Sequence, residues 1–136
     1  MATRLEPARR TTRQLALVLE AVQGSGVEHP SADRVFERVR RRLPRISLGT
    51  VYRNLQRLAA EGRIGVTYVE GRAARYDPTP TGHDHFVCQA CGRIEDVIAR
   101  RPVAGWRAAR RAGHLVTAHA LVLYGRCRAC RPGAPA

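Results

Sequence analysis

Two Cys-x-x-Cys pairs are the residues of this sequence with the clearest chemistry. Cys88 and Cys91 form the first pair, Cys127 and Cys130 form the second, and 35 residues separate the two pairs. Each pair presents two thiolates from one turn, so two pairs can converge on a single tetrahedral zinc ion. The spacing therefore predicts a structural zinc site. A redox disulfide is the weaker alternative, because neither pair is placed as in thioredoxin-like motifs, at the start of a helix that follows a strand.

A second group of metal-ligand side chains lies just before the first pair. His83 and His85 point to the same side if their segment is extended, because side chains alternate along a strand. Together with Asp77, six residues before His83, and Asp96, in the next predicted strand, they form a two-histidine, two-carboxylate pocket. His29, from the first half of the chain, could complete it. Mixed nitrogen and oxygen ligands suit Fe(II), Mn(II) or Zn(II).

The chain is strongly basic, with 24 arginines, no lysine, 11 acidic residues and a net charge of +13. A high-GC genome explains the absence of lysine but not the shortage of acids, so the charge favours a polyanionic partner, DNA or RNA. The longest apolar runs are short, and the start lacks the apolar stretch of a signal peptide. We therefore expect a cytoplasmic protein without a membrane-spanning segment. Thiols are reduced in that compartment, so paired cysteines there bind metal more often than they form disulfides.

The elements that must position these groups begin with three helices and a hairpin. Apolar residues at three- and four-residue spacing predict three helices that end near Gly24, Pro44 and Gly62. Two β-patterned segments follow, joined by a turn at residues 70–72. The predicted helices span residues 11–23, 31–43 and 47–61, and the predicted strands span residues 64–69 and 73–77.

This order of elements predicts a winged helix-turn-helix unit over residues 1–77, with residues 1–10 as a flexible arm. The third helix would enter the major groove of DNA, and basic side chains on the second helix and the wing would contact phosphates. A plain protein-interaction module is the alternative, but the basic face favours DNA. The predicted DNA contacts are Arg13, Thr50, Tyr52, Arg53, Asn54 and Arg57.

Residues 78–82, rich in proline and threonine, predict a hinge. Residues 83–136 predict a small α/β unit, whose apolar core is too small to make the unit stable by itself. Its predicted elements are strands at 86–88 and 93–98, a helix at 103–111 and a long strand at 114–125. We expect the long strand to pair across a dimer interface, and the tail from residue 132 to be disordered. The expected fold class is thus α+β, with an N-terminal winged-helix domain and a C-terminal α/β dimerisation domain carrying the zinc site.

Five motifs in this order resemble the ferric uptake regulator family, the bacterial repressors that include iron, zinc, manganese and peroxide sensors. The resemblance runs from about residue 12 to residue 130. The motifs are HPSAD at 29–33, SLGTVYRNL at 47–55, RYD at 75–77, HDHFVCQACG at 83–92 and LYGRCRAC at 123–130.

The resemblance implies a homodimeric, metal-dependent repressor of operator DNA. It implies structural Zn(II) at the four cysteines and Fe(II) or Mn(II) as the corepressor. The regulatory metal ligands that it implies are His29, Asp77, His83, His85 and Asp96. Relatives tuned to zinc often carry a cysteine near the position of Asp77, so a carboxylate there favours the harder metals.

One position bears on the signal that is sensed. Asp96 resembles the peroxide sensors of the family, where iron sensors more often carry glutamate. If the chain is a peroxide sensor, the resemblance implies that iron-catalysed oxidation modifies His29 or His83. Glu95, next to Asp96, could compete as the ligand, and a repressor that responds to iron, manganese or zinc levels without sensing peroxide is the alternative.

Many relatives also carry a third metal site, and this chain departs from it. Asp84 and His119 are present, but Gly82 replaces a frequent histidine and residues 102–103 offer no carboxylate. We therefore expect the third site to be absent or incomplete, with His119 as a dimer-interface or structural residue. His114 has no predicted role.

Two other function classes fit less well. A zinc deaminase needs His-x-Glu and Pro-Cys-x-x-Cys around an open zinc position, and neither motif occurs here. We therefore do not expect an enzyme. An RNA-binding zinc-knuckle protein is the remaining alternative.

Overall fold

The computed structural model describes residues 12–26, 28–80, 82–98 and 104–133. The chain divides into two compact units, residues 1–80 and residues 81–136, and each is described by itself. The predicted arm, residues 1–10, and the last residues of the predicted disordered tail lie outside the described residues. No helix in the described part is both long and apolar enough to span a membrane.

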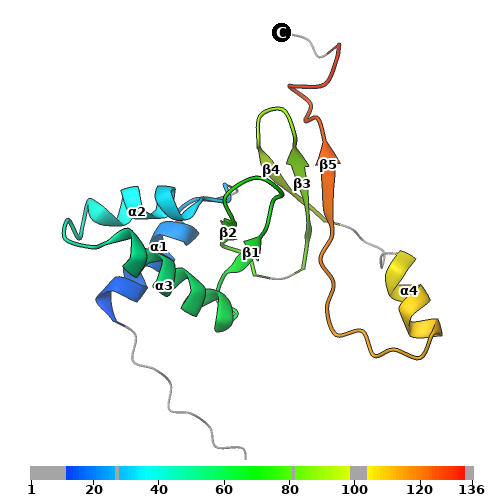
Figure 1. Ribbon diagram of the computed structural model, residues 1–136, viewed down its shortest axis with the longest axis horizontal. Helices are drawn as coiled ribbons and strands as arrows, with labels where there is room; N and C mark the ends of the chain where they lie inside the picture. Colours follow the sequence, from blue (N-terminus) through cyan, green and yellow to red (C-terminus); the bar gives the residue numbers. More distant parts are fainter. Residues whose placement is uncertain (1–11, 27, 81, 99–103, 134–136) are drawn as a thin grey trace, which may run out of the picture. The chain divides into compact units, whose positions relative to one another are not determined.

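The first unit consists of three helices and a two-stranded hairpin (Figure 1). A hydroxyl side chain caps the start of each helix and accepts the N–H three residues later, which satisfies a backbone donor that the helix leaves free. The caps are Thr12, Ser31 and Ser47. The elements are α1 (Arg13–Gln23), α2 (Ala32–Arg40), α3 (Leu48–Ala60), β1 (Gly65–Thr67) and β2 (Arg75–Asp77). The predicted order of helices and strands is confirmed.

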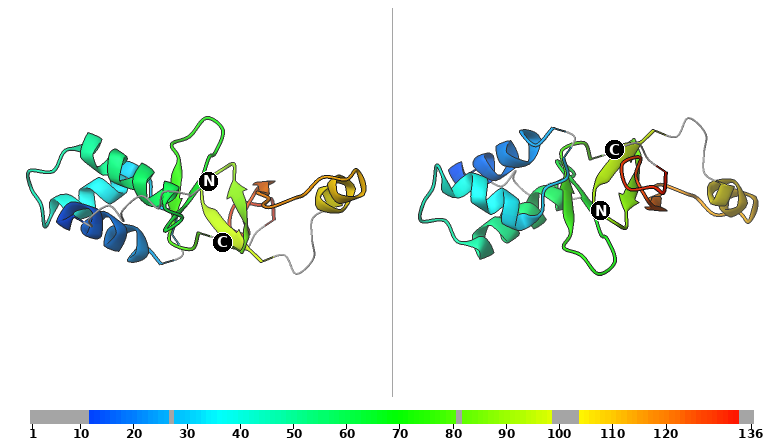
Figure 2. Two further views of the ribbon diagram at one scale, coloured as in Figure 1. Left: turned by 90° about the horizontal axis from the view of Figure 1, so that it is seen from below. Right: turned by 90° about the horizontal axis from the view of Figure 1, so that it is seen from above.

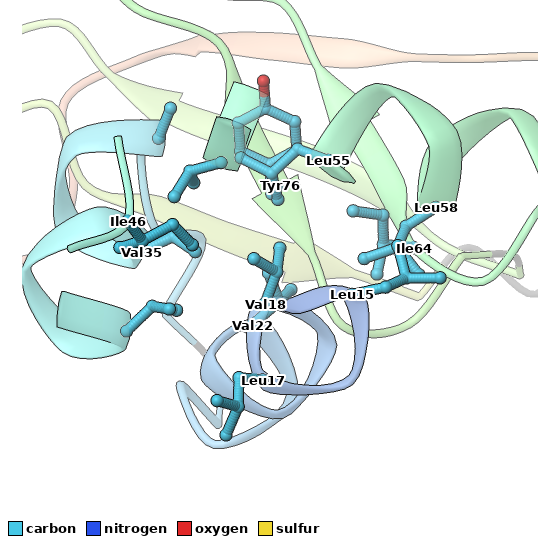
Figure 3. Close-up of a cluster of buried hydrophobic side chains, with 13 residues drawn as sticks. Leu15, Leu17, Val18, Val22, Val35, Ile46, Leu55, Leu58, Ile64 and Tyr76 are labelled. Carbon is cyan, nitrogen blue, oxygen red and sulfur yellow. The ribbon is translucent and has the colours of Figure 1, made fainter. Parts of the chain in front are cut away.

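One continuous apolar core holds this unit together, and Figure 3 shows its side chains converging from all three helices and the hairpin. Leu15 and Val18 of α1, Leu55 of α3 and Ile64 before β1 are almost fully buried. Each large aliphatic side chain buried in this way contributes on the order of 2 kcal/mol. The core therefore fixes α3 relative to the hairpin. The side of α3 that faces away from the core remains exposed.

Two boundaries in this unit differ from prediction. Helix α2 ends at Arg40, three residues early, because the residue before Pro44 is disfavoured in a helix and the last turn tightens. The N–H groups of Arg42 and Leu43 both donate to the carbonyl of Val39 there. The two strands are also shorter than predicted, because their ladder pairs only Gly65–Thr67 with Arg75–Asp77. The turn between them contains Gly71, with a φ of 68°, where it was predicted.

The second unit is a three-stranded sheet with one separate helix (Figure 2). Its elements are β3 (Asp84–Cys88), β4 (Ile94–Val97), α4 (Ala104–Arg111) and β5 (Val122–Gly125). Strand β3 lies in the middle, antiparallel to β4 and parallel to β5. The fold class expected from the sequence is confirmed.

The prediction of one long strand over residues 114–125 was wrong for most of its length. Only Val122–Gly125 forms a ladder, because β3 offers paired backbone groups only opposite those residues. The described part of the chain provides no strand opposite residues 115–120. A β-patterned segment without a neighbour forms no ladder, and pairing of this segment across a dimer interface stays a prediction.

Candidate metal centres and nucleic-acid interface

The four cysteines gather at one end of the three-stranded sheet. Cys88 is the last residue of β3 and lies opposite Gly125, two residues before Cys127, in the parallel β3–β5 ladder. Each Cys-x-x-Cys segment then turns tightly. The N–H of Gly92 donates to the carbonyl of Cys88 at 2.8 Å, and the N–H of Cys130 donates to the carbonyl of Cys127 at 2.9 Å. As a result, the four Sγ atoms all lie within 4.8 Å of one another.

This sulfur geometry fits a tetrahedral metal ion. Cys91 Sγ and Cys127 Sγ are 3.8 Å apart, and a tetrahedron with Zn–S bonds of about 2.3 Å has sulfur–sulfur edges of about 3.8 Å. All four cysteines are free thiols. Without a metal, hydrogen bonds that the Cys130 thiol donates to its neighbours, Cys127 first and Cys91 next, raise the pKa of Cys130 to about 12. A central cation would remove this competition for protons, because it binds all four groups as thiolates.

Backbone hydrogen bonds prepare one of these sulfurs for metal binding. The N–H of Cys127 donates to Cys88 Sγ at 3.3 Å. This bond, followed by the backbone donors of Cys91 and Ala90, lowers the pKa of the Cys88 thiol to about 6. The parallel pairing of β3 with β5 thus supplies part of the thiolate character that a zinc ligand needs.

His29 and Asp77 form a buried pair within the first unit. His29 lies in the loop before α2, and the N–H of Tyr76 donates to the carbonyl of Pro30 at 3.0 Å, which ties that loop to β2. His29 Nε2 consequently lies 3.5 Å from Asp77 Oδ2, and both side chains are almost completely buried. The other carboxylate oxygen of Asp77 accepts the N–H of Thr79 at 2.7 Å.

His83, His85 and Asp96 come together within the second unit. Asp96 on β4 lies opposite His85 on β3, and its Oδ1 atom is 3.5 Å from His83 Nε2 and 3.9 Å from His85 Nε2. The two imidazole rings meet edge to face, with centroids 4.8 Å apart. Each unit therefore assembles its own part of the predicted five-ligand set, with imidazole nitrogens and carboxylate oxygens as donors.

Glu95, the competing carboxylate, lies on the other face of the sheet. It is opposite Phe86 in the β3–β4 ladder, one position away from the His85–Asp96 pair. Its Oε1 atom is 3.6 Å from Arg93 Nη1. Because side chains alternate between faces along a strand, Glu95 cannot join the two histidines without a shift in register.

Five of the six predicted DNA contacts lie on α3, and they differ in exposure and in hydrogen bonding. Tyr52 and Arg53 are exposed, and Arg53 Nη2 donates to Thr50 Oγ1 at 3.0 Å. Asn54 Nδ2 instead donates to the carbonyl of Thr50 at 3.0 Å, within the helix. Arg57 Nε donates to Glu61 Oε1 at 2.7 Å. Arg13 is exposed at the start of α1. Arg13, Tyr52 and Arg53 are therefore the exposed members of the six.

Two residues near this surface were absent from the predicted contacts. Gln56 lies one turn after Tyr52, and Tyr68, directly after β1, is 77% exposed. With Tyr52 and four others they line a pocket of about 330 Å³ between α3 and the hairpin. Helical spacing from Tyr52 could have indicated Gln56, but nothing in the sequence placed Tyr68 beside that helix. Burial raises the pKa of Tyr76, and the nearby phenols of Tyr52 and Tyr68 raise it further.

Asp84 and His119, which correspond to two residues of the relatives' third site, form a pair. Asp84 is buried, and its Oδ1 atom lies 3.3 Å from His119 Nε2. Trp106 of α4 packs edge to face on His119, with ring centroids 5.2 Å apart. Within the described ranges, no group of three or more potential metal ligands includes either residue. The arrangement favours a structural role for His119.

Comparison with known proteins points to one family. Residues 7–124 match the ferric uptake regulator family. The chain is 30% identical over 131 residues to the peroxide operon regulator of Bacillus subtilis, covering 96% of this chain and 90% of the relative. It is 34% identical over 119 residues to a ferric uptake regulation protein of Legionella pneumophila, covering 84% and 85%. The structure is similar to the Campylobacter jejuni peroxide stress regulator, with a TM-score of 0.71, 29% identity and coverage of 88% and 87%.

Proposed function

The chain belongs to the ferric uptake regulator family, and we propose that it is a repressor that binds operator DNA as a homodimer when a regulatory metal is present. Members of this family are metal-dependent regulators of transcription that bind DNA as dimers, and they are not enzymes. For this chain we further propose structural Zn(II) at the four cysteines and Fe(II) or Mn(II) as the corepressor.

The donor set around the two histidine–carboxylate groups is the observation that carries this proposal. His29 and Asp77 belong to the first unit, whereas His83, His85 and Asp96 belong to the second. We propose that one metal ion takes ligands from both sets and thereby holds the two units in a fixed arrangement. Without the shared metal, the ligands no longer hold α3 at the spacing that the operator needs, and operator affinity falls. A tenfold loss needs only about 1.4 kcal/mol of differential stabilisation.

The nature of the donors supports Fe(II) or Mn(II) over softer metals. Imidazole and carboxylate ligands suit these ions, and none of the five residues offers a thiolate. The side chain of Asp96 is one methylene shorter than the glutamate that iron sensors more often carry, and we propose that this leaves a coordination position open. Bound iron would supply the oxidising chemistry when peroxide arrives. Oxidation of the imidazole of His29 or His83 would then remove a nitrogen ligand and release the DNA.

DNA recognition rests on α3, whose exposed side carries Tyr52 and Arg53. We propose that these two side chains contact base edges in the major groove and that the arginines of α2 contact phosphates. The dimer presents two copies of α3, so the operator should contain two half-sites related by a two-fold axis.

A repressor that senses metal level without sensing peroxide is the second candidate. The chain is similar both to a peroxide operon regulator and to a ferric uptake regulation protein, at 30% and 34% identity. The similarities therefore favour neither branch over the other.

An anaerobic titration of the zinc-loaded protein onto duplex DNA from its own promoter tests the proposal. Mn(II) and Fe(II) should each promote binding, and dilute peroxide should release only the iron-loaded protein. If peroxide leaves the iron-loaded protein bound, the metal-level repressor is the correct alternative. If neither metal promotes binding but added Zn(II) does, the proposed corepressor is wrong.

A further inference from the structure

The last part of the chain carries only positive charge. No aspartate or glutamate follows Asp96, whereas eight arginines lie between residues 97 and 136. A genome that favours arginine over lysine changes the type of basic residue but does not remove acids. This segment therefore has an unbalanced positive charge that the codon bias does not explain.

The arginines of the first unit differ, because many of them are already paired with carboxylates. Five described arginines of that unit lie within 4.0 Å of a glutamate oxygen. The pairs are Arg34–Glu37, Arg38–Glu28, Arg42–Glu20, Arg57–Glu61 and Arg63–Glu61. Among the described arginines of the second unit, only Arg93 has such a partner, Glu95. The described arginines of the second unit are thus paired with carboxylates less often than those of the first.

Some of these arginines have a local explanation. Arg126, Arg128 and Arg131 surround the second cysteine pair in the sequence. Four thiolates around one Zn(II) ion carry a net charge of −2, which nearby guanidinium groups can balance. The arginines of α4 have no comparable counter-charge in the described part of the chain.

Helix α4 presents its three arginines on one face. Arg107, Arg110 and Arg111 are all exposed, at i, i+3 and i+4 spacing, while Trp106 turns towards His119. The helix stands apart from the sheet of its own unit in both views of Figure 2, and none of its residues is buried. Cations in the last turn favour the helix dipole, but that dipole amounts to only about half an elementary charge. Three guanidinium groups exceed what the dipole requires.

We propose that the arginine face of α4 is a second DNA-contacting surface, which binds phosphates of double-stranded DNA without regard to sequence. The inference rests on the proposed function, since it assigns to the second unit a contact with the same partner as α3. A helix with exposed guanidinium groups and no carboxylate neighbour among the described residues suits a phosphate backbone, and such contacts add affinity without reading bases. An anionic membrane is a poorer fit, because Trp106, the apolar side chain that would anchor the helix, already packs on His119.

The salt dependence of binding tests this inference. The full-length zinc-loaded protein is titrated, with and without Mn(II), onto a random-sequence duplex and onto its operator at several salt concentrations. Combined Arg107→Gln, Arg110→Gln and Arg111→Gln substitutions should make the slope of log affinity against log salt shallower by about 0.9 for each lost phosphate contact. Arg93→Gln, an exposed arginine of the same unit that is paired with Glu95, serves as the matched control and should retain the wild-type slope. Zinc content, gel filtration and the emission of Trp106 establish that the variants are folded.

The outcomes separate this inference from the proposed function. If the wild-type protein binds its operator with Mn(II) and the triple variant keeps the wild-type slope on both duplexes, the α4 surface is wrong and the repressor function stands. If the wild-type protein binds neither duplex with any metal, the proposed function fails as well. If the triple variant loses binding to phosphatidylglycerol vesicles that the wild-type protein shows, and its duplex binding is unchanged, α4 is a membrane surface and the inference is overturned.

Discussion

Asp96 lies directly opposite His85 in the antiparallel β3–β4 ladder, and its Oδ1 atom is 3.9 Å from His85 Nε2. The same oxygen lies 3.5 Å from Nε2 of His83, just before β3. One carboxylate oxygen on β4 therefore lies within 4 Å of both imidazoles. A change in strand register by one residue would put Glu95 in the place of Asp96.

Asp96→Asn should weaken Mn(II) binding more than tenfold, because it removes the anionic oxygen nearest both histidines while keeping the side-chain shape. Glu95→Gln is the matched control, since Glu95 is paired with Arg93 on the other face of the sheet. Isothermal titration of the zinc-loaded variants with Mn(II) checks this expectation. Equal losses in the two variants would contradict the assignment of Asp96 as the ligand.

His29→Ala should abolish metal-dependent operator binding, because the first unit loses its imidazole donor. The four cysteines lie in the other unit, so zinc content and the dimer should be retained. His114→Ala, at an exposed position, should bind the operator like the wild type. Anisotropy with labelled operator, together with zinc analysis, measures both effects. Loss of zinc or of the dimer in His29→Ala would show that the assignment is wrong.

Removal of zinc should unfold the second unit and leave the first folded. The second unit has few buried side chains, and zinc bound by four thiolates contributes on the order of 10 kcal/mol to folding. The only tryptophan of the chain, Trp106, lies in this unit and reports its unfolding, whereas the helical circular dichroism of α1–α3 should persist. Cys127→Ser should behave like the chelated protein. An unchanged Trp106 spectrum after chelation would argue against a structural metal.

Arg53→Ala should cost about 1–3 kcal/mol of operator binding and relax the preference for one base position, if Arg53 contacts a base edge. Arg40→Ala removes an exposed arginine of α2 that lies over the Phe36 ring rather than beside a glutamate, and should weaken binding to operator and random DNA alike. Competition between the two duplexes distinguishes these effects. A uniform loss for Arg53→Ala would place that residue on a phosphate.

The first unit should lose stability as the pH falls below about 4.5. A hydrogen bond from Arg57 lowers the pKa of Glu61 below its ordinary value of 4.5, with further lowering by Arg63. The folded state therefore binds this proton less readily than the unfolded state. The stabilisation is present above pH 4.5 and is lost as the pH falls through the lowered pKa. Glu61→Gln should flatten this part of the urea-midpoint profile, measured by helical circular dichroism, whereas Glu37→Gln should not.

Several features of this protein could be read from local sequence. Helical periodicity and the caps Thr12, Ser31 and Ser47 predicted three helices, and Cys-x-x-Cys spacing predicted a group of four sulfurs that the structure brings together. These features depend on residues a few positions apart, so covalent geometry and backbone periodicity determine them. The composition likewise determined that the chain after Asp96 is purely basic.

Contacts between distant segments were decided only by the tertiary structure. Strand register placed Asp96 beside the histidines and Glu95 on the other face, whereas the sequence left both possible. The arrangement of the hairpin beside α3 brought Tyr68 to the same pocket as Tyr52. The long strand predicted after residue 114 formed only where β3 provided a neighbour. Ladder pairing and ion pairing join residues far apart in the chain, and their free energies depend on the packed arrangement, which no local pattern encodes.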